Sequence, residues 1–302
     1  MQLDHDNLRA LAAVVREGSF ERAAAALHVT PSAVSQRIKT LESRMGRLLV
    51  LRTAPVQATA DGRVLVQLAN QAAVLEHEAL DRLGMSADKP VPSLRIAVNH
   101  DSLETWFIEA AARYAAQTRA TLDMIPEDQD HSAALLRNGS VLAAVTTLGA
   151  PVQGCRVHAL GSMRYVATCT PGFRARHFPQ GVTADALAQA PVLVFNRKDD
   201  MQAQSVRPIM GGQAWQPPTW WVPSSHAFVA ATLAGLGWTL NPLPMVQASL
   251  DAGHLVPVWP DRWHDVPLYW QYWRTGTHTM EQLTTAVLQA ARTLAQPAAA
   301  GA

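Results

Sequence analysis

Hydroxyl, amide and cationic side chains gather in a short stretch near the start of the chain. The residues with this chemistry are Ser32, Ser35, Gln36, Arg37, Lys39 and Arg52. The Gln36 amide can form two hydrogen bonds with the edge of an adenine, and the Arg37 guanidinium can form two with a guanine. Ser32 and Ser35 suit a phosphate or base edge. Lys39 and Arg52 suit phosphates, and phosphate contacts set affinity without reading sequence.

The local charge fits the same chemistry. Residues 30–52 carry five basic side chains and one acid, Glu42, although the chain of 302 residues has a formal net charge of only +1. A basic cluster inside a near-neutral protein is typical of a nucleic-acid footprint. A solvated helix face without a partner would give the same charges, so the cluster alone leaves both interpretations open. For Ser32 in particular, surface chemistry and DNA contact remain open.

Three short amphipathic helices are expected to position these side chains. The first ends at Gly18, the second begins after the N-cap Ser19, and the third begins after Thr30 with Pro31 in its first turn. Their apolar stripes are Leu8, Leu11, Ala12 and Val15; Phe20, Ala23, Ala24 and Leu27; and Val34, Ile38, Leu41 and Met45. Only residues 28–30 separate the last two helices. Two short helices joined by a tight turn, with a polar outer face, indicate a helix-turn-helix.

A wing and a linker helix are expected to follow. Residues 48–59 fit a two-stranded wing with Pro55 near its tip. From Asp61 the apolar residues Leu65, Leu68, Ala72, Leu75 and Ala79 step by three and four, the rhythm of a two-helix seam. Dimerisation and packing on the helix's own domain are the two explanations of this stripe. Dimerisation is favoured because a lone linker helix has no other surface to bury that face against.

Composition limits the class of protein. Hydrophobic residues make up 48% and charged residues 16%, which is a globular composition with room for two or three domains. Cys155 and Cys169 form no C-x-x-C pair, which argues against a disulfide framework. Asp4, Asp6 and Arg9 are incompatible with a signal peptide, and no window approaches the ~20 apolar residues of a membrane span. We therefore expect a cytoplasmic protein without a membrane partner.

Strand-like and helix-like runs alternate in the C-terminal part, which predicts an α/β architecture with mostly parallel sheets. Expected strands are 94–98, 121–125, 141–146, 164–169, 192–195, 219–222, 255–259 and 268–273. Expected helices start near Ser102, Ser132, Thr183, Ser225 and Thr277. Residues 85–93, with two prolines, are expected to be a linker, and the low-complexity tail 295–302 is expected to fray.

Polar residues follow several of these strands, where ligands bind in open α/β sheets. They are Asn99, Asp101, Ser102, Glu127, Asp128, Thr146, Thr147, Asn196, Asp199, Asp200, Ser224 and Ser225. A zwitterionic amino acid would suit such a cleft. Ser102, Thr147 and a helix start would hold its carboxylate, and Asp101, Glu127 or Asp200 would hold its ammonium groups. These residue types also cap helices and form turns, so each one retains that structural alternative. Trp106 could line the cleft or pack in the core.

The stretch AAAALHVTPSAVSQRIKTLESRMGRLLVLRT, with the linker helix after it, resembles the LysR-type transcriptional regulators, and its L-x-x-R-T wing adds Thr53 to the DNA-contact candidates. The stretches RTAPVQAT, IAVNHDSLETW, APVLVFNRKDDM, SSHAFV and PLYWQYWR resemble the ArgP/LysG branch, which controls export of basic amino acids. The likeness covers nearly the whole chain. Pro31 stands where such regulators often have Gln, and Asn196 and His226 stand where the branch tends to have acids.

The resemblance implies a multidomain α/β protein. Its parts are an N-terminal winged helix-turn-helix (all-α with a wing), a linker helix and a two-lobed effector domain like a periplasmic binding protein. The expected boundaries are 1–60, 61–84, a hinge at 85–93, and 94–302, with lobe 1 at about 94–163 and 272–296 and lobe 2 at about 164–271. It further implies a homodimer or homotetramer on double-stranded promoter DNA. The implied small-molecule effector is lysine or arginine, with no cofactor, and RNA polymerase is a further expected partner.

Rival classes fit the sequence less well. The chain has no G-x-S-x-G, P-loop or H-E-x-x-H motif and no histidine pair at helical zinc spacing, so an enzyme is not expected. A solute-binding protein, which binds a small molecule without a regulatory role, is the main alternative. It would leave residues 1–83 unexplained. A purely architectural DNA-binding protein would not need about 200 residues of cleft-forming α/β structure.

Overall fold

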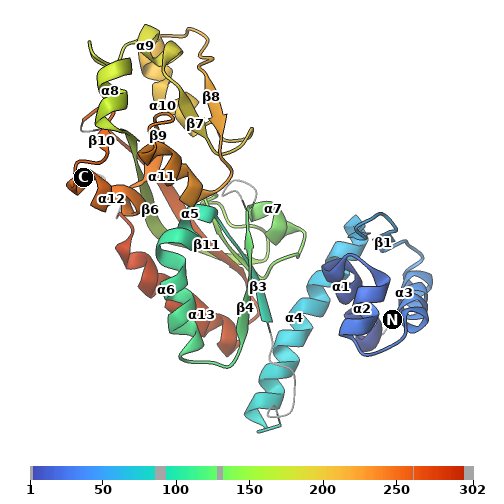
Figure 1. The fold of residues 1–302 in the computed structure, drawn as a ribbon. Coiled ribbons are helices and arrows are strands. Elements are labelled where there is room, and N and C mark those ends of the chain that lie inside the picture. The colour runs from blue at the N-terminus through green and yellow to red at the C-terminus, as the bar shows by residue number, and fades with distance from the viewer. Residues whose placement is uncertain (1–2, 86–92, 128–131, 261, 296–302) are drawn as a thin grey trace. The chain divides into compact units, whose positions relative to one another are not determined.

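The computed structural model describes residues 3–85, 93–127, 132–260 and 262–295 (Figure 1). The chain forms two compact units. The first comprises Met1–Val98, Ala111–His158 and Trp270–Val287, and the second comprises Asn99–Ala110, Ala159–Tyr269 and Leu288–Ala302. Most of the expected linker 85–93 and the tail beyond residue 295 lie outside the described residues, as does Asp128. None of the helices in the described ranges has the length and apolarity that a bilayer crossing requires.

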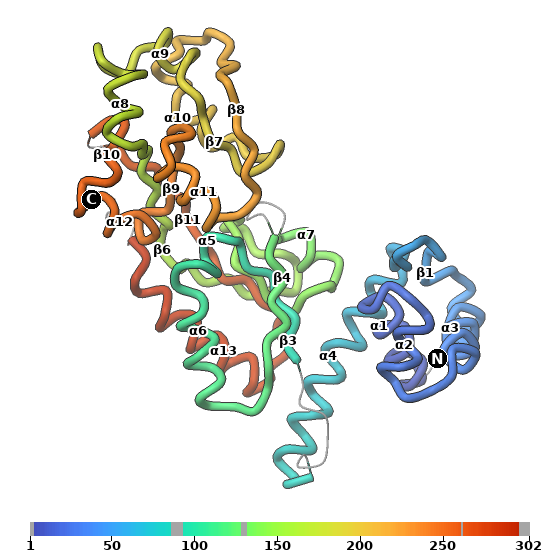
Figure 2. The backbone as a smooth tube through the Cα atoms, viewed as in Figure 1, coloured from blue at the N-terminus to red at the C-terminus, as the bar shows by residue number. Residues whose placement is uncertain are grey.

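All three predicted N-terminal helices are present, and the second and third begin after their expected capping residues, Ser19 and Thr30. The helices are α1 (His5–Glu17), α2 (Phe20–Ala26) and α3 (Pro31–Met45), and Figure 2 shows the chain winding through them in order. Ser19 Oγ accepts a hydrogen bond from Arg22 N, and Thr30 Oγ1 accepts one from Ala33 N. These bonds satisfy backbone donors that the first helical turn leaves free. The wing is a two-stranded antiparallel ribbon of β1 (Val50–Leu51) and β2 (Gln57–Ala58).

The apolar stripes meet in one small core. It contains Leu8, Leu11, Val14, Ala23, Ala24, Val34, Ile38, Leu41, Leu49 and Val50, all buried. The predicted α3 stripe is confirmed: Val34, Ile38 and Leu41 are fully buried, and Met45 packs against their edge. Burial of this face leaves the opposite, polar side of α3 on the surface.

The turn before α3 contains His28, whose φ of +53° is unusual for a residue with a side chain. We expect His28→Gly to leave stability within about 1 kcal/mol of wild type or raise it slightly, because glycine adopts this φ freely but gains entropy when unfolded. His28→Val should cost about 1–2 kcal/mol, since a β-branched residue resists positive φ. Urea unfolding of the two variants checks this. Equal losses would show that backbone conformation does not set the cost.

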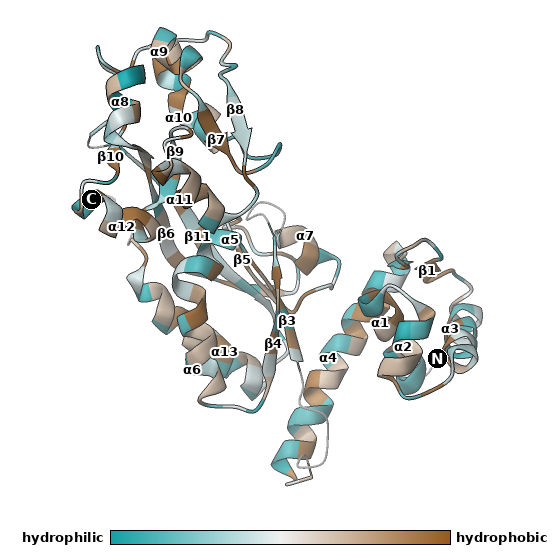
Figure 3. Cartoon of the chain, viewed as in Figure 1, coloured by the Kyte–Doolittle hydropathy of each residue, from teal (hydrophilic) through white to brown (hydrophobic). Residues whose placement is uncertain are grey.

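The linker helix α4 (Ala60–Arg82) follows the wing without a break. Its first turns pack on α1, so Leu65, which we expected on a dimer seam, lies instead in the core of the winged domain with Val66 and Ala69. Farther along, Leu68 and Leu75 are 40% and 49% exposed, as a free seam requires. Figure 3 shows apolar and polar residues alternating along this helix.

The rest of the first unit contains a parallel sheet. Strand β3 (Ser93–Val98) pairs with β4 (Thr121–Pro126) along its whole length and with β5 (Ala143–Thr146) on its other side. The helices of this part are most of α6 (Ile108–Ala115), α7 (Ser132–Arg137) and most of α13 (His278–Ala290). Ala97, Leu136, Val141, Ala144 and Val152 form its buried core.

The second unit combines two long strands with several short ones. Strand β6 (Cys155–Cys169) pairs antiparallel with β9 (Thr239–Pro242) and β10 (Val256–Pro257), while β7 (Val192–Val194) and β8 (Thr219–Trp221) pair in parallel. Both β6 and β11 (Trp263–Trp273) run from one unit into the other. The helical segments that lie wholly in the second unit are α5 (His100–Ser102), the π-helical turn η1 (Leu103–Phe107), α8 (Pro171–His177), α9 (Ala184–Gln189), α10 (Met201–Met210), α11 (Ser225–Leu233), α12 (Leu243–Asp251) and the 3-10 turn η2 (Ala291–Thr293).

Two expectations about this part need correction. The sheets are less parallel than predicted, because β6 pairs antiparallel with two neighbours. In addition, β9, α8, α10 and α12 were not predicted. Strand β9 has the sequence TLNP, which is too short to show a period. Helix α10 has Pro208 in its interior, a residue that normally argues against a helix.

Candidate functional site

The outer face of α3 offers the chemistry that the sequence predicted. Ser32, Gln36 and Lys39 are exposed and Ser35 is half-buried, all on the side opposite Val34 and its buried neighbours. Toward the rest of the described chain, Gln36 and Lys39 form neither a hydrogen bond nor an ion pair, so both remain available to a partner. Exposed amide and ammonium groups on one face of a helix are typical of a recognition helix that contacts DNA.

Other DNA-contact candidates are held by neighbours within the domain. Arg37 Nη2 pairs with Asp6 Oδ2 at 2.9 Å, so a base contact by Arg37 requires that pair to open. The Arg52 guanidinium lies 5.4 Å from the centre of the Phe20 ring, and Thr53 Oγ1 donates to the Pro55 carbonyl at 2.7 Å. Ser32 Oγ lies 3.0 Å from the capping hydroxyl of Thr30. Arg52 and Thr53 are nevertheless exposed on the wing side of the helix-turn-helix.

The second unit contains a buried carboxylate, that of Asp101. Asp101 accepts hydrogen bonds from two hydroxyls: Tyr165 Oη donates to Oδ2 at 2.6 Å, and Ser225 Oγ donates to Oδ1 at 2.8 Å. The three residues come from α5, β6 and the start of α11, and any two of them are at least 60 residues apart in sequence. Among the described residues, no Lys or Arg forms an ion pair with Asp101.

Burial dominates the electrostatics of this cluster. Desolvation raises the pKa of Asp101 above its ordinary value, and the hydroxyls of Tyr165 and Ser225 only partly offset this. Burial, together with the neighbouring carboxylate, raises the pKa of Tyr165 well above its ordinary value, so its hydroxyl stays protonated and donates. Burial also raises the pKa of Asp199, which faces the same cluster. A carboxylate in such surroundings would be stabilised by a cation placed beside it.

Two buried polar atoms next to Asp101 have no hydrogen-bond partner. They are Asn99 Oδ1 and Ser102 Oγ, at the start of the helical segment that carries Asp101. Buried polar groups almost always find a partner, so an unpaired pair beside a carboxylate marks a place where a ligand would supply hydrogen bonds. The π-helical turn η1, one residue farther on, is another feature that is frequent at functional sites.

The other predicted effector residues are distributed over both units. In the second unit, Asn196 Oδ1 accepts from Lys198 N, Asp200 Oδ2 accepts from Gln204 Nε2, and Ser224 caps α11 by accepting from Ala227 N. Asn196 and Ser224 thus take the turn and cap roles that the sequence left as an alternative, whereas Asp200 pairs with a side chain of its own helix and makes no capping bond. Glu127, Thr146 and Thr147 follow β4 and β5 in the first unit.

Sequence reasoning missed Tyr165 and gave too little weight to Asp199. Tyr165 lies inside a strand, and no local pattern marks it as a partner of Asp101. Asp199, rather than Asp200, faces inward: its carboxylate accepts from Phe195 N and Met201 N at 3.1 Å and holds the loop that follows β7. His226 Nδ1 also pairs with Glu104 Oε2 at 2.9 Å, so α11 and η1 are joined beside the Asp101–Ser225 bond.

Known proteins resemble this chain over nearly its whole length. The family described as "Bacterial regulatory helix-turn-helix protein, lysR family" matches residues 5–63, and the "LysR substrate binding domain" matches residues 87–295. The HTH-type transcriptional regulator LysG of Mycobacterium tuberculosis is 47% identical over 290 residues, which are 96% of this chain and 94% of LysG.

Solved structures agree. The crystal structure of ArgP from Mycobacterium tuberculosis matches with a TM-score of 0.85 and 46% identity, covering 98% of this chain and 100% of ArgP. Full-length LysG from Corynebacterium glutamicum, solved with the bound effector Arg, matches with a TM-score of 0.76 and 39% identity, covering 98% of this chain and 100% of LysG.

Proposed function

The chain belongs to the LysR family of DNA-binding, effector-responsive transcriptional regulators, and from this premise we propose that it senses lysine or arginine and reads its operator with the outer face of α3. The single observation that carries the effector proposal is the buried Asp101 cluster with two unpaired polar atoms beside it. The LysG relative with bound Arg supports the same ligand class.

On the DNA side, Gln36 would read a base edge and Lys39 would contact phosphate. Their exposure and freedom from internal partners support these roles. Ser35 would add a short contact from the same face. Arg52 and Thr53 would reach the backbone from the wing. Ser32 and Arg37 would contact DNA only after their hydrogen bonds with Thr30 and Asp6, respectively, have broken.

On the sensing side, a cationic amino acid would place a positive group near Asp101. Asn99 Oδ1 would accept a hydrogen bond from an ammonium or guanidinium donor, and Ser102 Oγ would donate to the ligand's carboxylate. Asn196, Asp200, Ser224 and Ser225, with Glu127, Thr146 and Thr147 of the first unit, complete the proposed site. A basic ligand gains most here because the carboxylate is buried without a cationic partner.

The regulator would work as a homodimer or homotetramer in the bacterial cytoplasm, with RNA polymerase as a further partner. The exposed apolar side chains Val64, Leu68 and Leu75 on α4 support a two-helix seam between subunits. We keep the boundaries 1–60, 61–84, 85–93 and 94–302 as the proposed domain division, with the hinge at 85–93.

Calorimetric titration of the full-length protein tests the ligand class. Lysine or arginine should bind at one site per subunit, and binding should also raise the melting temperature. Norleucine and citrulline, which keep the shape of lysine and arginine but lack the side-chain charge, should bind at least tenfold more weakly. Equal affinity for charged and neutral members of either pair would overturn the proposal that Asp101 recognises a cation.

A further inference from the structure

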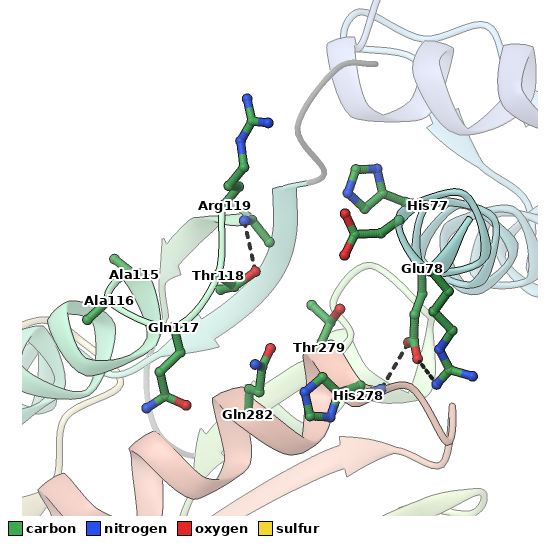
Figure 4. Close-up of a pocket in the computed structure, with 13 residues that line it drawn as sticks. His77, Glu78, Ala115, Ala116, Gln117, Thr118, Arg119, His278, Thr279 and Gln282 are labelled. Carbon is green, nitrogen blue, oxygen red and sulfur yellow. Dashed lines mark hydrogen bonds and ion pairs between the residues drawn. The ribbon is translucent and has the colours of Figure 1, made fainter. Parts of the chain in front are cut away.

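The linker helix α4 contacts the effector part of its own chain through polar groups. Glu78 Oε2 accepts a hydrogen bond from the backbone N of His278 at 2.9 Å, and Glu78 Oε1 accepts one from Arg82 Nη2 at 2.6 Å. Figure 4 shows Glu78 reaching from α4 toward the start of α13. The Glu78 side chain is only 12% exposed, although it lies near the end of a long helix. We call the bond between Glu78 and His278 N the docking contact.

The docking contact satisfies a backbone donor at the start of α13. The first N–H groups of a helix lack partners within the helix and carry partial positive charge. Thr277 Oγ1 takes the N–H of Met280, while the Glu78 carboxylate takes that of His278. A residue 200 positions away in sequence therefore completes the N-terminal cap of α13. This bond is charge-assisted, which makes it stronger than a neutral hydrogen bond.

A second close approach lies about two to three turns earlier on α4. A Cβ atom at Gly139 would lie 2.4 Å from Gln67 Cβ, so the turn after α7 comes directly against α4. Asn70 Nδ2 also donates to the Gly139 carbonyl, at 3.4 Å. Helix α4 therefore meets the effector part near Gln67 as well as at Glu78.

The surface between these elements is polar. A cavity of about 660 Å³ opens between α4, the turn after α6 and the start of α13, and Figure 4 shows His77, Glu78, His278 and Gln282 around it. Alanines apart, every residue that lines the cavity has a polar or charged side chain. The lining is therefore polar where α4 approaches α13, and the docking contact joins the two helices there by a hydrogen bond.

The other end of α4 is part of the winged helix-turn-helix. Leu65, Val66 and Ala69 lie in the core that also holds Val34 and Ile38 of the recognition helix α3. With a rise of 1.5 Å per residue, the 23 residues of α4 form a rod about 34 Å long. A rod packed in the DNA-binding core at one end and hydrogen-bonded to the start of α13 at the other links these two parts of the chain.

We propose that Glu78 is a positioning residue that docks α4 on the N-terminus of α13 and so couples the effector domain to the DNA-binding domain. The inference goes beyond the proposed function and rests on it only for the identity of the effector. Loss of the docking contact should free the end of α4, leaving both domains folded and both binding sites intact. The DNA-binding domain would then no longer follow the state of the effector domain.

Glu76 provides a matched control. It has the same side chain on the same helix, two residues away, and therefore points about 200° around the helix from Glu78. It is 55% exposed and pairs with His5 of α1 at 2.9 Å rather than with the effector part. Glu76→Ala should therefore leave docking unchanged, whereas Glu78→Ala should abolish it. Glu78→Gln, which keeps an acceptor oxygen but lacks the charge, should lie between the two.

A distance measurement tests docking without any effector. Spin labels at Ala73→Cys on α4 and Thr285→Cys on α13 occupy exposed positions, while the native Cys155 and Cys169 are buried and have pKa values raised by burial to about 11 and 12, which protects them from labelling. Labelled subunits are diluted into unlabelled ones so that each distance lies within one subunit. The distance distribution should be narrow for wild type and Glu76→Ala and should broaden for Glu78→Ala. A narrow distribution in Glu78→Ala overturns the inference.

DNA binding tests the coupling. In Glu78→Ala the ratio of operator Kd with and without effector should become about one, while the calorimetric Kd for the effector stays at the wild-type value and stability falls only by the about 0.5–2 kcal/mol expected for a lost helix cap. A merely structural role would lower stability in the same way but leave that ratio intact, and a full wild-type response in Glu78→Ala contradicts the inference. If wild type responds to neither lysine nor arginine, the proposed effector is wrong, and the distance comparison alone decides whether Glu78 docks α4.

Discussion

Gln36→Ala should weaken binding to the operator by on the order of 10- to 100-fold, because one bidentate contact to a base contributes about 1–3 kcal/mol of discrimination. The loss should be confined to duplexes that carry the base pair read by Gln36, and binding to unrelated DNA should not change. Gln36 is exposed and has no internal hydrogen bond, so removing its amide breaks no contact within the described protein. Gln117→Ala, another exposed glutamine, is the matched control and should bind like wild type.

Lys39→Ala is the complementary variant on the same face of α3. It should weaken all DNA sequences alike and lower the slope of log K against log salt by about 0.9 for one lost phosphate contact. Arg207→Ala removes one positive charge from α10 and should leave that slope unchanged. Fluorescence anisotropy at several salt concentrations measures both quantities. If the Gln36→Ala and Lys39→Ala double variant binds DNA as tightly as wild type, α3 does not dock as we propose.

Asp101→Ala should weaken effector binding by on the order of 10- to 100-fold, since a hydrogen bond to a charged group contributes about 1.5–3 kcal/mol. It also leaves the hydroxyls of Tyr165 and Ser225 without their acceptor. Asp101→Asn keeps the shape and one acceptor oxygen, so it should preserve the fold but still lose much of the effector affinity. Asp185→Asn, an exposed carboxylate in the same unit, should bind the effector like wild type.

The Asp101 carboxylate should also make the stability of the folded protein depend on pH. Burial raises the folded-state pKa of Asp101, so the folded protein holds this proton more tightly than the unfolded chain does. The contribution of Asp101 to stability is therefore fully favourable below the unfolded pKa of about 4 and falls as pH rises toward the raised folded value. Asp101→Asn lacks this loss. Its melting temperature relative to wild type should rise between pH 4 and pH 7, and a constant difference would show that the carboxylate is not desolvated as we describe.

The N-terminal domain was largely predictable because its signals are local. Ser19 and Thr30 are capping residues beside their helices, and the α3 stripe of Val34, Ile38 and Leu41 can be read from spacing alone. The wing and the linker helix followed in the same way. The burial of Leu65 could not be predicted, because the same apolar period fits a dimer seam and contact with α1.

The sequence predicted several residues of the site, but it could not predict which of them hydrogen-bond to one another. Strand ends identified Asp101 and Ser225 as candidates, yet the bond between them joins residues 124 positions apart. Tyr165 lies within a strand where a buried tyrosine needs no special explanation. Asp199 and Asp200 are neighbours, and only the conformation of the loop after β7 decides which carboxylate turns inward. The pairing of Arg37 with Asp6 likewise depends on how α1 packs on α3.

Footprinting of the full-length protein tests the central claim most directly. The operator is first recovered by selection from a random-sequence library, and the protected region and Kd are then measured with and without each amino acid. Our account predicts that lysine or arginine, and not norleucine or citrulline, changes the footprint or shifts the Kd severalfold, and that Asp101→Ala removes this response. Protection and affinity that stay the same with every amino acid would contradict it.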